Sequence, residues 1–456
     1  MLRIALFTIF LFIFSASTYG SQASNIQKLV KQYEELGWFS GNVLVFKHQD
    51  KIFESSVGYA NLDQGIKNQA DTLFDIGSIQ KDLTAVLVLQ AVDDGLIGLD
   101  EPLAKYVSDL PSDISNKVKV IHLLQHTSGI PDIFNAEYRT NFRLYDTIAK
   151  TITLVNDANL LFEPGRDRRY SNMGYVLLGA ILEKAYNKDY WALAETMIMS
   201  KVRATSLETT GVMPKVMAEL YHFNYDGQQV LVEEDQREHK GPAGGGFYSA
   251  TDLMLFYQQL FNGKLLSKSS LAFFKNLQKD NSQWVAFGGG KGVSTAVEIN
   301  FVSGIWVFVL ANTDGLVAEE ISARIMGLMH EGEIEVPRAP PTTFAYKLYK
   351  KIGKKRFNEE FKPRYKAEGY ETFIGRVLTD LGRNLISAGK PEESIFFFEY
   401  LTKNFPEVPE VYDGLALGYF SSGYHKEALN AFQKSVAMKP DYQSLFHPTN
   451  YIVNLK

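Results

Sequence analysis

The sequence predicts an α+β protein in which an antiparallel β-sheet is flanked by helices and joined to a helical subdomain, followed by an all-α segment of helical repeats. Strand patterns lie at 41–57 and 293–310, and helical patterns fill most of the interval from about 80 to 200. A third observation is a sequence repeat in the tail with an offset of 34 residues. Together these patterns place the sheet before the repeats along the chain.

Each strand region is typical of a β-hairpin. Residues 41–46 and 52–57 alternate or run apolar around a polar turn, and 293–301 and 304–310 form a second pair. An amphipathic helix is expected at 317–329. Because strand patterns stand at both ends of this region, we expect its N- and C-terminal parts to build one sheet together.

A proline cluster at 337–341 marks the end of the first domain, because it resists both helix and central strand. We therefore expect a first domain at 21–335 and a linker with a helix at 336–376. The basic residues at 347–356 are interpreted as the solvated face of that helix. The alternative is a weak contact with anionic lipid or cell wall.

The tail carries the repeat. Residues 388–393 align with 422–427 at an offset of 34, and apolar helices and a closing proline recur at the same offset. This pattern resembles the tetratricopeptide (TPR) repeat and predicts TPR-like repeats over 377–446. Such repeats suit a peptide or protein partner, whereas the alternative is that they only pack on the first domain.

Residues 1–20 have the pattern of a signal peptide. A positive charge at Arg3 precedes an apolar run at 4–14, and small residues follow. The alternative is an N-terminal anchor that is not cleaved. Since the chain has no cysteine, disulfides and a lipidated cysteine are excluded, and we expect an exported protein of a bacterial periplasm or one released from the cell.

Length and composition bound the function. A chain of 456 residues is too long for one compact core, and 45% hydrophobic residues are ordinary for a globular protein. The net charge of −5 gives no reason to expect nucleic acid as a partner. The eight histidines are scattered without paired spacing, so no metal and no cofactor are expected.

Ser78 and Lys81 form the most informative pair of side chains. They stand three residues apart at the start of an apolar helix, so that both emerge on one face. A serine hydroxyl needs an adjacent base to act as a nucleophile, and a lysine can be that base. The same spacing recurs at Ser387 and Lys390, where it falls in a turn and predicts no chemistry.

Two further segments carry groups that suit a cleft. Tyr170 and Asn172 lie on a loop that enters an apolar helix, where a phenol can move a proton and an amide can hold a carbonyl or a lysine. The segment Phe287, Gly288, Gly289 and Gly290 precedes the second hairpin. Its glycines let a ligand approach the backbone of a strand, although taken alone they favour a bulge or a loose turn.

In order and context, these segments resemble those of the penicillin-recognising serine hydrolases and, within them, the class C β-lactamase-like group. The resemblance covers about 25–335 and rests on five segments in the same order, at 72–81, 123–131, 170–175, 243–252 and 310–313. It implies the fold of serine β-lactamases and DD-peptidases for this part of the chain. The Ser-x-x-Lys signature is typical of these enzymes.

The resemblance also implies roles for single residues. Ser78 would be the acylated nucleophile, Lys81 would help to deprotonate it, and Tyr170 would relay protons and later activate water. Asn172 would bind substrate and hold Lys81. The oxyanion hole would use the backbone amides of Ser78 and of a residue on the glycine strand, for which Gly290 is the candidate. The segment of His126 is structural in this family.

The chain departs from the family at Phe287, where lysine or histidine is usual. That cation meets the carboxylate of a β-lactam or a D-Ala-D-Ala stem, and phenylalanine cannot replace it, because a buried carboxylate without a partner is costly. Carboxylesterases of this group are similar in having Trp-Gly-Gly here. Lys291, four residues on, is a candidate substitute.

These observations predict an exported serine hydrolase that forms an acyl-enzyme on Ser78 with ester or small amide substrates, as a carboxylesterase does. Within the same class, a D-amino-acid peptidase or a weak β-lactamase stays an alternative. A different class is a catalytically impaired binding protein whose TPR-like tail recruits a partner; Phe287 favours it, and intact Ser78 and Lys81 oppose it. Membrane contact is expected only through the signal segment or a weak surface contact.

Overall fold

The computed structural model describes residues 20–107, 110–156, 158–203, 216–237, 240–331 and 337–438. Apart from residue 20, the predicted signal segment lies outside the described residues. The chain divides into two compact units, one of Met1–His222 and Leu231–Pro337, the other of Phe223–Val230 and Arg338–Lys456. No sequence pattern predicted that residues 223–230 belong with the tail. None of the described helices is both long and apolar enough to cross a membrane.

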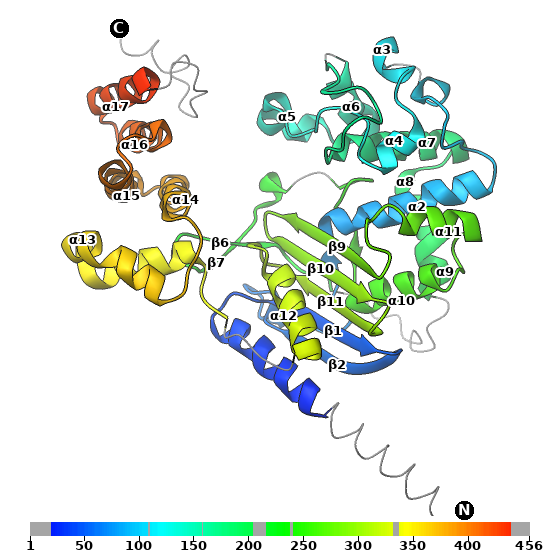
Figure 1. The fold of residues 1–456 in the computed structure, drawn as a ribbon, viewed down its shortest axis with the longest axis horizontal. Coiled ribbons are helices and arrows are strands. Elements are labelled where there is room, and N and C mark those ends of the chain that lie inside the picture. Colours follow the sequence, from blue (N-terminus) through cyan, green and yellow to red (C-terminus); the bar gives the residue numbers. More distant parts are fainter. Residues whose placement is uncertain are drawn as a thin grey trace, which may run out of the picture. The chain divides into compact units, whose positions relative to one another are not determined.

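The first unit is built on a five-stranded antiparallel sheet with the order β2-β1-β11-β10-β9. Its central pairing joins the two ends of the unit, since Gly41 lies opposite Ala311 and Lys47 opposite Ile305 (Figure 1). This confirms the predicted α+β fold with a sheet shared by N- and C-terminal parts. The strands are β1 (Gly41–Lys47), β2 (Asp50–Val57), β9 (Gln283–Gly290), β10 (Val293–Asn300) and β11 (Ile305–Ala311).

Helices flank this sheet and form a helical subdomain beside it (Figure 1). The longer ones are residues 20–35, α2 (Gln80–Asp93), α7 (Asn172–Tyr186), α10 (Ala250–Phe261), α11 (Lys268–Lys275) and α12 (Val317–Glu331). The short ones are α3 (Ser112–Ser115), α4 (Val120–Leu124), α5 (Ala136–Asn141), α6 (Ile148–Ile152), α8 (Tyr190–Leu193) and α9 (Ser200–Arg203). Short strands complete the unit: β3 (Tyr59–Asn61), β4 (Ile66–Lys67), β5 (Phe74–Asp75) and β8 (Phe247–Tyr248). Two more, β6 (Tyr221–Phe223) and β7 (Gln229–Leu231), have residues in both units.

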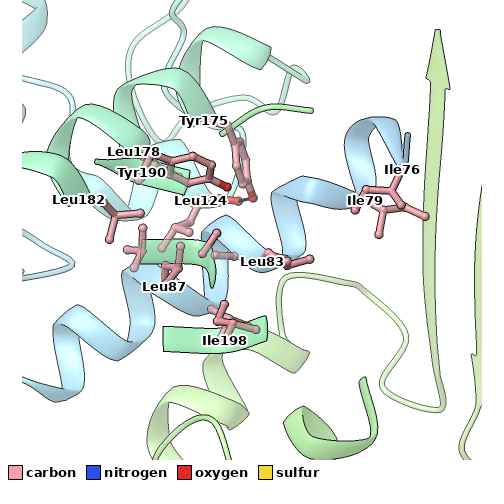
Figure 2. Close-up of a cluster of buried hydrophobic side chains, with 14 of the residues drawn as sticks. Ile76, Ile79, Leu83, Leu87, Leu124, Tyr175, Leu178, Leu182, Tyr190 and Ile198 are labelled. Atoms are coloured by element: carbon pink, nitrogen blue, oxygen red, sulfur yellow. Dashed lines mark hydrogen bonds between the residues drawn. The ribbon is translucent and has the colours of Figure 1, made fainter. Parts of the chain in front are cut away.

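Helix α2 runs through the middle of the hydrophobic core. Eleven of its 14 residues are buried, so it is a helix packed on all sides rather than an amphipathic surface helix. Figure 2 shows Leu83 and Leu87 of α2 in a cluster with Leu178 and Leu182 of α7 and with Ile198. This packing fixes the start of α2, and the single 3₁₀ turn η1 (Gly77–Ile79) that precedes it holds Ser78.

The second unit is helical apart from residues 223–230. It contains α13 (Pro341–Ala367), α14 (Ile374–Ser387), α15 (Pro391–Asn404), α16 (Pro409–Ser421) and α17 (His425–Met438), and α14 to α17 pack on one another in sequence. Helix α13 occupies the predicted linker and kinks at Gly353, whose φ is 75°. Helices α15 and α17 begin 34 residues apart, as the repeat does. The assignment to the TPR class stays a prediction.

Candidate active site

The 3₁₀ turn that carries Ser78 is packed against the glycine-rich end of β9. Gly77 has a φ of 50°, and a Cβ atom at this position would lie 2.9 Å from the backbone nitrogen of Gly289. A Cβ atom on Gly288 would lie 2.0 Å from the carbonyl oxygen of Ile76. A side chain is therefore excluded at both glycines, Gly77 and Gly288. Because neither position has one, the turn that holds Ser78 can pack directly against the edge strand β9.

The structure brings Ser78, Lys81 and Tyr170 together. Lys81 Nζ lies 3.0 Å from Ser78 Oγ, and the Tyr170 hydroxyl donates to the same oxygen at 2.8 Å. Lys81 is buried, and its Nζ also lies 4.8 Å from the centroid of the Tyr170 ring. Two groups that can carry a proton thus bond to the oxygen of one serine, which is the arrangement that nucleophilic catalysis requires.

Asn172 completes the contacts of Lys81. Lys81 Nζ donates to Asn172 Oδ1 at 2.8 Å and to the carbonyl oxygen of Ala243. Asn172 is itself held by Asp132, which accepts from the backbone nitrogen at 2.9 Å and from Nδ2 at 3.0 Å. Because Asn172 Nδ2 donates to the Asp132 carboxylate, the amide is oriented with its oxygen, Oδ1, toward Lys81. Sequence reasoning missed Asp132, although it directly follows one of the five matched segments.

The ring of Tyr170 rests on His126. The ring centroids lie 4.6 Å apart, and His126 Nδ1 accepts from the backbone nitrogen of Ser171 at 3.3 Å. Burial and, to a smaller extent, the charges of Lys81 and Arg168 lower the pKa of His126 to about 4. The imidazole is therefore neutral at pH 7 and serves as a packing surface and acceptor, which agrees with the structural role predicted for its segment.

The Tyr170 hydroxyl is held in its protonated form. Desolvation raises the pKa of Tyr170 to about 12, and the bond to Ser78 opposes this rise. The negative charges of Asp132 and Asp82 add to the rise. Although the residue as a whole is about half exposed, its oxygen points at Ser78, so the phenol can donate a proton at the nucleophile.

A cleft of about 300 Å³ opens above Ser78. Tyr170, Asn172, Gly289 and Gly290 line it; the sequence predicted a catalytic role for Tyr170 and substrate contacts for the other three. Phe287 and Gly288 are not among the lining residues: Phe287 is 44% exposed, and Gly288 packs on the turn before Ser78. The structure therefore brings two of the four predicted residues of the glycine segment to the cleft and leaves two outside its lining.

Charged side chains that the sequence analysis did not single out also line the cleft. They are Asp75, Arg237 and Lys240, and they join Lys291, whose Nζ donates to Gln236 Oε1 at 2.6 Å. Arg237 and Lys240 belong to a charged loop without periodicity, so no sequence pattern predicted their position. Within the described parts of the chain, no group of three or more His, Cys, Asp or Glu side chains is placed to hold a metal ion.

Comparisons with known proteins identify the family of this chain. The family model "Beta-lactamase" matches residues 23–325, and the chain belongs to that family. It is 26% identical over 287 residues to penicillin-binding protein 4* of Bacillus subtilis, covering 59% of this chain and 63% of the relative. It is 24% identical over 251 residues to teichoic acid D-alanine hydrolase of Staphylococcus aureus, covering 55% and 61%. The chain thus spans less than two thirds of the length of these curated relatives.

A solved structure shows the same fold. The penicillin-binding protein of Bacillus halodurans superposes with a TM-score of 0.57 at 25% identity, covering 66% of this chain and 99% of that protein. The family match ends at residue 325, before the helical tail, and therefore concerns the unit that holds Ser78.

Proposed function

We propose that this chain, a member of the β-lactamase family, is a serine hydrolase that cleaves esters or small amides through an acyl-enzyme on Ser78. The observation that carries the proposal is the convergence of Lys81 Nζ and the Tyr170 hydroxyl on Ser78 Oγ, at 3.0 and 2.8 Å. Members of this family are serine hydrolases, and the geometry supplies a nucleophile with a base and an acid in contact.

Acylation follows from these contacts. Ser78 Oγ attacks the carbonyl carbon of the substrate while its proton passes to the Lys81 amine. The raised pKa of Tyr170 keeps the phenol protonated, so the phenol gives its proton to the leaving oxygen or nitrogen as that bond breaks. Lys81 then returns a proton to Tyr170. The developing oxyanion would be held by the Ser78 amide and by a backbone amide of β9, with Gly290 as the candidate.

Deacylation uses the same groups. A water molecule attacks the acyl carbon and gives a proton to the Tyr170 oxygen while the phenol passes its own proton to the neutral Lys81 amine. Ser78 Oγ then leaves and takes a proton from Lys81. Asn172 keeps Lys81 in place during both steps, because its Oδ1 accepts from Nζ and its other atoms are bonded to Asp132. No ion or cofactor is needed for atoms or charges to balance.

The substrate class follows from what lines the cleft. The residue that would supply the usual cation of the glycine strand is Phe287, and its side chain lies outside the lining. Phe287 offers no partner to a substrate carboxylate, and the ammonium of Lys291, the candidate substitute that lines the cleft, is bonded to Gln236. This favours neutral esters and small amides over penicillins.

The test uses p-nitrophenyl acetate and butyrate together with a serine-directed phosphonate. We expect the wild-type protein to release p-nitrophenol and to be labelled at Ser78, and Ser78→Ala to lose both. Ser387→Ala is the matched control, because it removes the serine of the second Ser-x-x-Lys copy, which is exposed in the tail. Wild-type protein that shows neither turnover nor labelling would instead support the catalytically impaired binding protein.

Export is part of the proposal and rests on the pattern of residues 1–20. We expect the protein in the periplasmic or extracellular fraction of a bacterial host. N-terminal sequencing of the purified protein would distinguish a cleaved signal peptide from a retained anchor. Retention of the full chain in the cytosolic fraction would contradict export and leave the proposed chemistry untouched.

A further inference from the structure

A second groove lies at the end of the sheet that is opposite to the catalytic cleft. Gly290, which lines the cleft, ends β9 and pairs with the first residue of β10. The groove lies where β10 ends at Asn300 and β11 begins at Ile305. Because β10 is eight residues long, roughly 25 Å of strand separates the two places. The groove has a volume of about 240 Å³, and the proposed chemistry does not use it.

Aromatic side chains form the apolar part of the groove. Phe46 on β1 and Trp306 on β11 are direct cross-strand partners, so their side chains leave the same face of the sheet. Phe301, which follows β10, lines the same groove. All three are only partly buried, and Trp306 Nε1 bonds to no other described residue. The groove therefore presents aromatic surface to solvent together with one open donor.

Uncharged polar side chains complete the lining. Gln258 on α10 and Asn262 directly after it are four residues apart and share one side of that helix. His48 and Gln49 come from the turn between β1 and β2. In the described parts of the chain, no side-chain nitrogen or oxygen of these four residues takes part in a hydrogen bond. Among the described lining residues none is Asp, Glu, Lys or Arg, although these make up 22% of the chain.

The turn that supplies His48 and Gln49 is strained. Their φ values are 49° and 75°, as a type I′ turn requires, and Asn-Gly is the pair that this turn favours. Glutamine rarely adopts a positive φ, and such strain persists mainly where it serves a function. The imidazole lies over the neighbouring turn, because a Cβ atom on Gly304 would be 2.3 Å from His48 Nδ1. The two residues therefore suit the groove better than they suit the hairpin.

The lining distinguishes between classes of ligand. A charged ligand would find no opposite charge among the lining residues. An acyl chain or an apolar peptide would cover the open amides and the imidazole without bonding to them, which is costly. A sugar ring combines a face of C–H groups, which packs on aromatic rings, with a rim of hydroxyls. Asn, Gln and His side chains can both donate to those hydroxyls and accept from them.

We propose that this groove binds a neutral oligosaccharide. Its volume of about 240 Å³ is below the range of about 300–1,000 Å³ that encloses a whole drug-sized ligand. It therefore suits one or two sugar rings, with the rest of the saccharide in solvent. The site is separate from the proposed hydrolase chemistry, and neither depends on the other.

Isothermal titration calorimetry with chitotetraose, cellotetraose and maltotetraose tests the proposal. We expect wild-type protein to bind at least one of these neutral sugars saturably, with a Kd of about 0.1–1 mM. Trp306→Ala removes the largest ring and should weaken this binding by about tenfold or more. Ser78→Ala should bind as the wild-type protein does, so a failure of the proposed hydrolase would leave this proposal standing.

Asn262→Ala has a closely matched control in Asn276→Ala. Both asparagines directly follow a helix with nearly the same backbone angles, φ −79° and ψ 2° at Asn262 and φ −76° and ψ −1° at Asn276. Asn276 does not line the groove. We expect Asn262→Ala to weaken sugar binding by about threefold to tenfold and Asn276→Ala to leave it unchanged.

The double variant His48→Asn, Gln49→Gly separates loss of binding from loss of fold. It introduces the residues that the type I′ turn favours, so its melting temperature should rise by about 2–4 °C. It also removes two polar side chains from the groove and should weaken sugar binding by about fivefold or more. Weaker binding in a more stable protein cannot result from misfolding.

Several results would overturn the proposal. Wild-type protein that binds none of the three sugars would do so, as would binding that Trp306→Ala and Asn262→Ala leave unchanged. Self-association in sedimentation experiments that Trp306→Ala abolishes would assign the groove to a second copy of the chain. Binding of decanoate in place of the sugars, lost in Trp306→Ala, would assign it to acyl chains. Turnover of p-nitrophenyl butyrate should be the same in every groove variant, which keeps the two proposals distinguishable.

Discussion

The two Ser-x-x-Lys copies of this chain share a spacing and differ in everything around it. Between Ser78 and Lys81 the chain is continuously helical, from η1 into α2, and Lys81 Nζ reaches Ser78 Oγ at 3.0 Å. At the second copy, α14 ends at Ser387 and the chain turns at Gly389, whose φ is 71°. Lys390 then lies over the ring of Tyr225, and no hydrogen bond joins these two described residues, Ser387 and Lys390.

The surroundings of the two lysines differ as much as the backbone. Lys81 is buried and bonded to Asn172, which Asp132 holds in turn. Lys390 is solvated, and its hydrogen bond with Tyr225 raises its pKa, so it stays protonated and cannot act as a base. A spacing of three residues therefore predicts a catalytic pair only where a continuous helix and a buried polar partner accompany it.

The largest expected effect tests this comparison directly. Lys81→Met keeps an apolar stem of similar length and removes the amine, so we expect kcat/KM for p-nitrophenyl butyrate to fall by about 10³-fold. Lys390→Met makes the same change at the second copy and should leave kcat/KM within about twofold, since a surface substitution away from the site has little effect. An equal loss of kcat/KM in the two variants would contradict the assignment of only the first Ser-x-x-Lys copy to catalysis.

Tyr170→Phe should have the next largest effect, a fall in kcat of about 10²-fold, because it removes the proton donor at Ser78. The ring and its contact with His126 at 4.6 Å are kept, so folding should be unchanged. Tyr186→Phe is the control, because its hydroxyl also donates to a side chain, Asp94 Oδ2 at 2.8 Å, outside the cleft. Full activity of Tyr170→Phe would mean that the phenol takes no part in proton transfer.

The sequence predicted the elements that a local pattern or an ordered motif can specify. The strand patterns at the two ends of the first unit predicted the sheet. The order of the matched segments predicted that Ser78 and Tyr170 lie in one site. Asp132 and Asp75 were missed because a single carboxylate has no periodicity, and its role depends on which backbone lies opposite. For Phe287 the motif indicated the position on the strand correctly but not the direction of its side chain. Only the structure, in which β9 pairs with β10, shows that this side chain lies outside the cleft lining.

The buried network around Ser78 should also make stability depend on pH, which the solvated second copy should not. The pKa of His126 is about 4 in the folded protein, compared with 6.5 for the free side chain. Between pH 4 and 6.5 the unfolded chain therefore binds a proton at His126 that the folded chain does not bind. The contribution of the neutral His126 side chain to the free energy of unfolding is complete above pH 6.5 and decreases by up to about 3 kcal/mol as the pH falls to 4.

The variant for this prediction is His126→Asn, because asparagine tolerates the φ of 58° at this position and can accept from Ser171. Urea unfolding at a series of pH values between 7 and 4 should show the wild-type protein losing about 3 kcal/mol relative to this variant. His330→Asn, at an exposed position on α12, should follow the wild-type curve. Parallel curves for all three proteins would contradict the burial of a neutral imidazole at His126.

The smallest expected effect concerns the departure from the family at Phe287. Phe287→Lys restores the usual cation on β9, and we expect it to raise the rate of acylation by benzylpenicillin relative to p-nitrophenyl butyrate. Because Phe287 is 44% exposed and outside the cleft lining, the new charge is screened by solvent, and the gain should be about threefold to tenfold rather than that of a buried ion pair. Val302→Lys, at an exposed position in the turn after β10, is the control for added positive charge. A penicillin rate that rises equally in both variants would reflect general attraction of an anion, whereas no rise in Phe287→Lys would show that this position does not correspond to the family's cation.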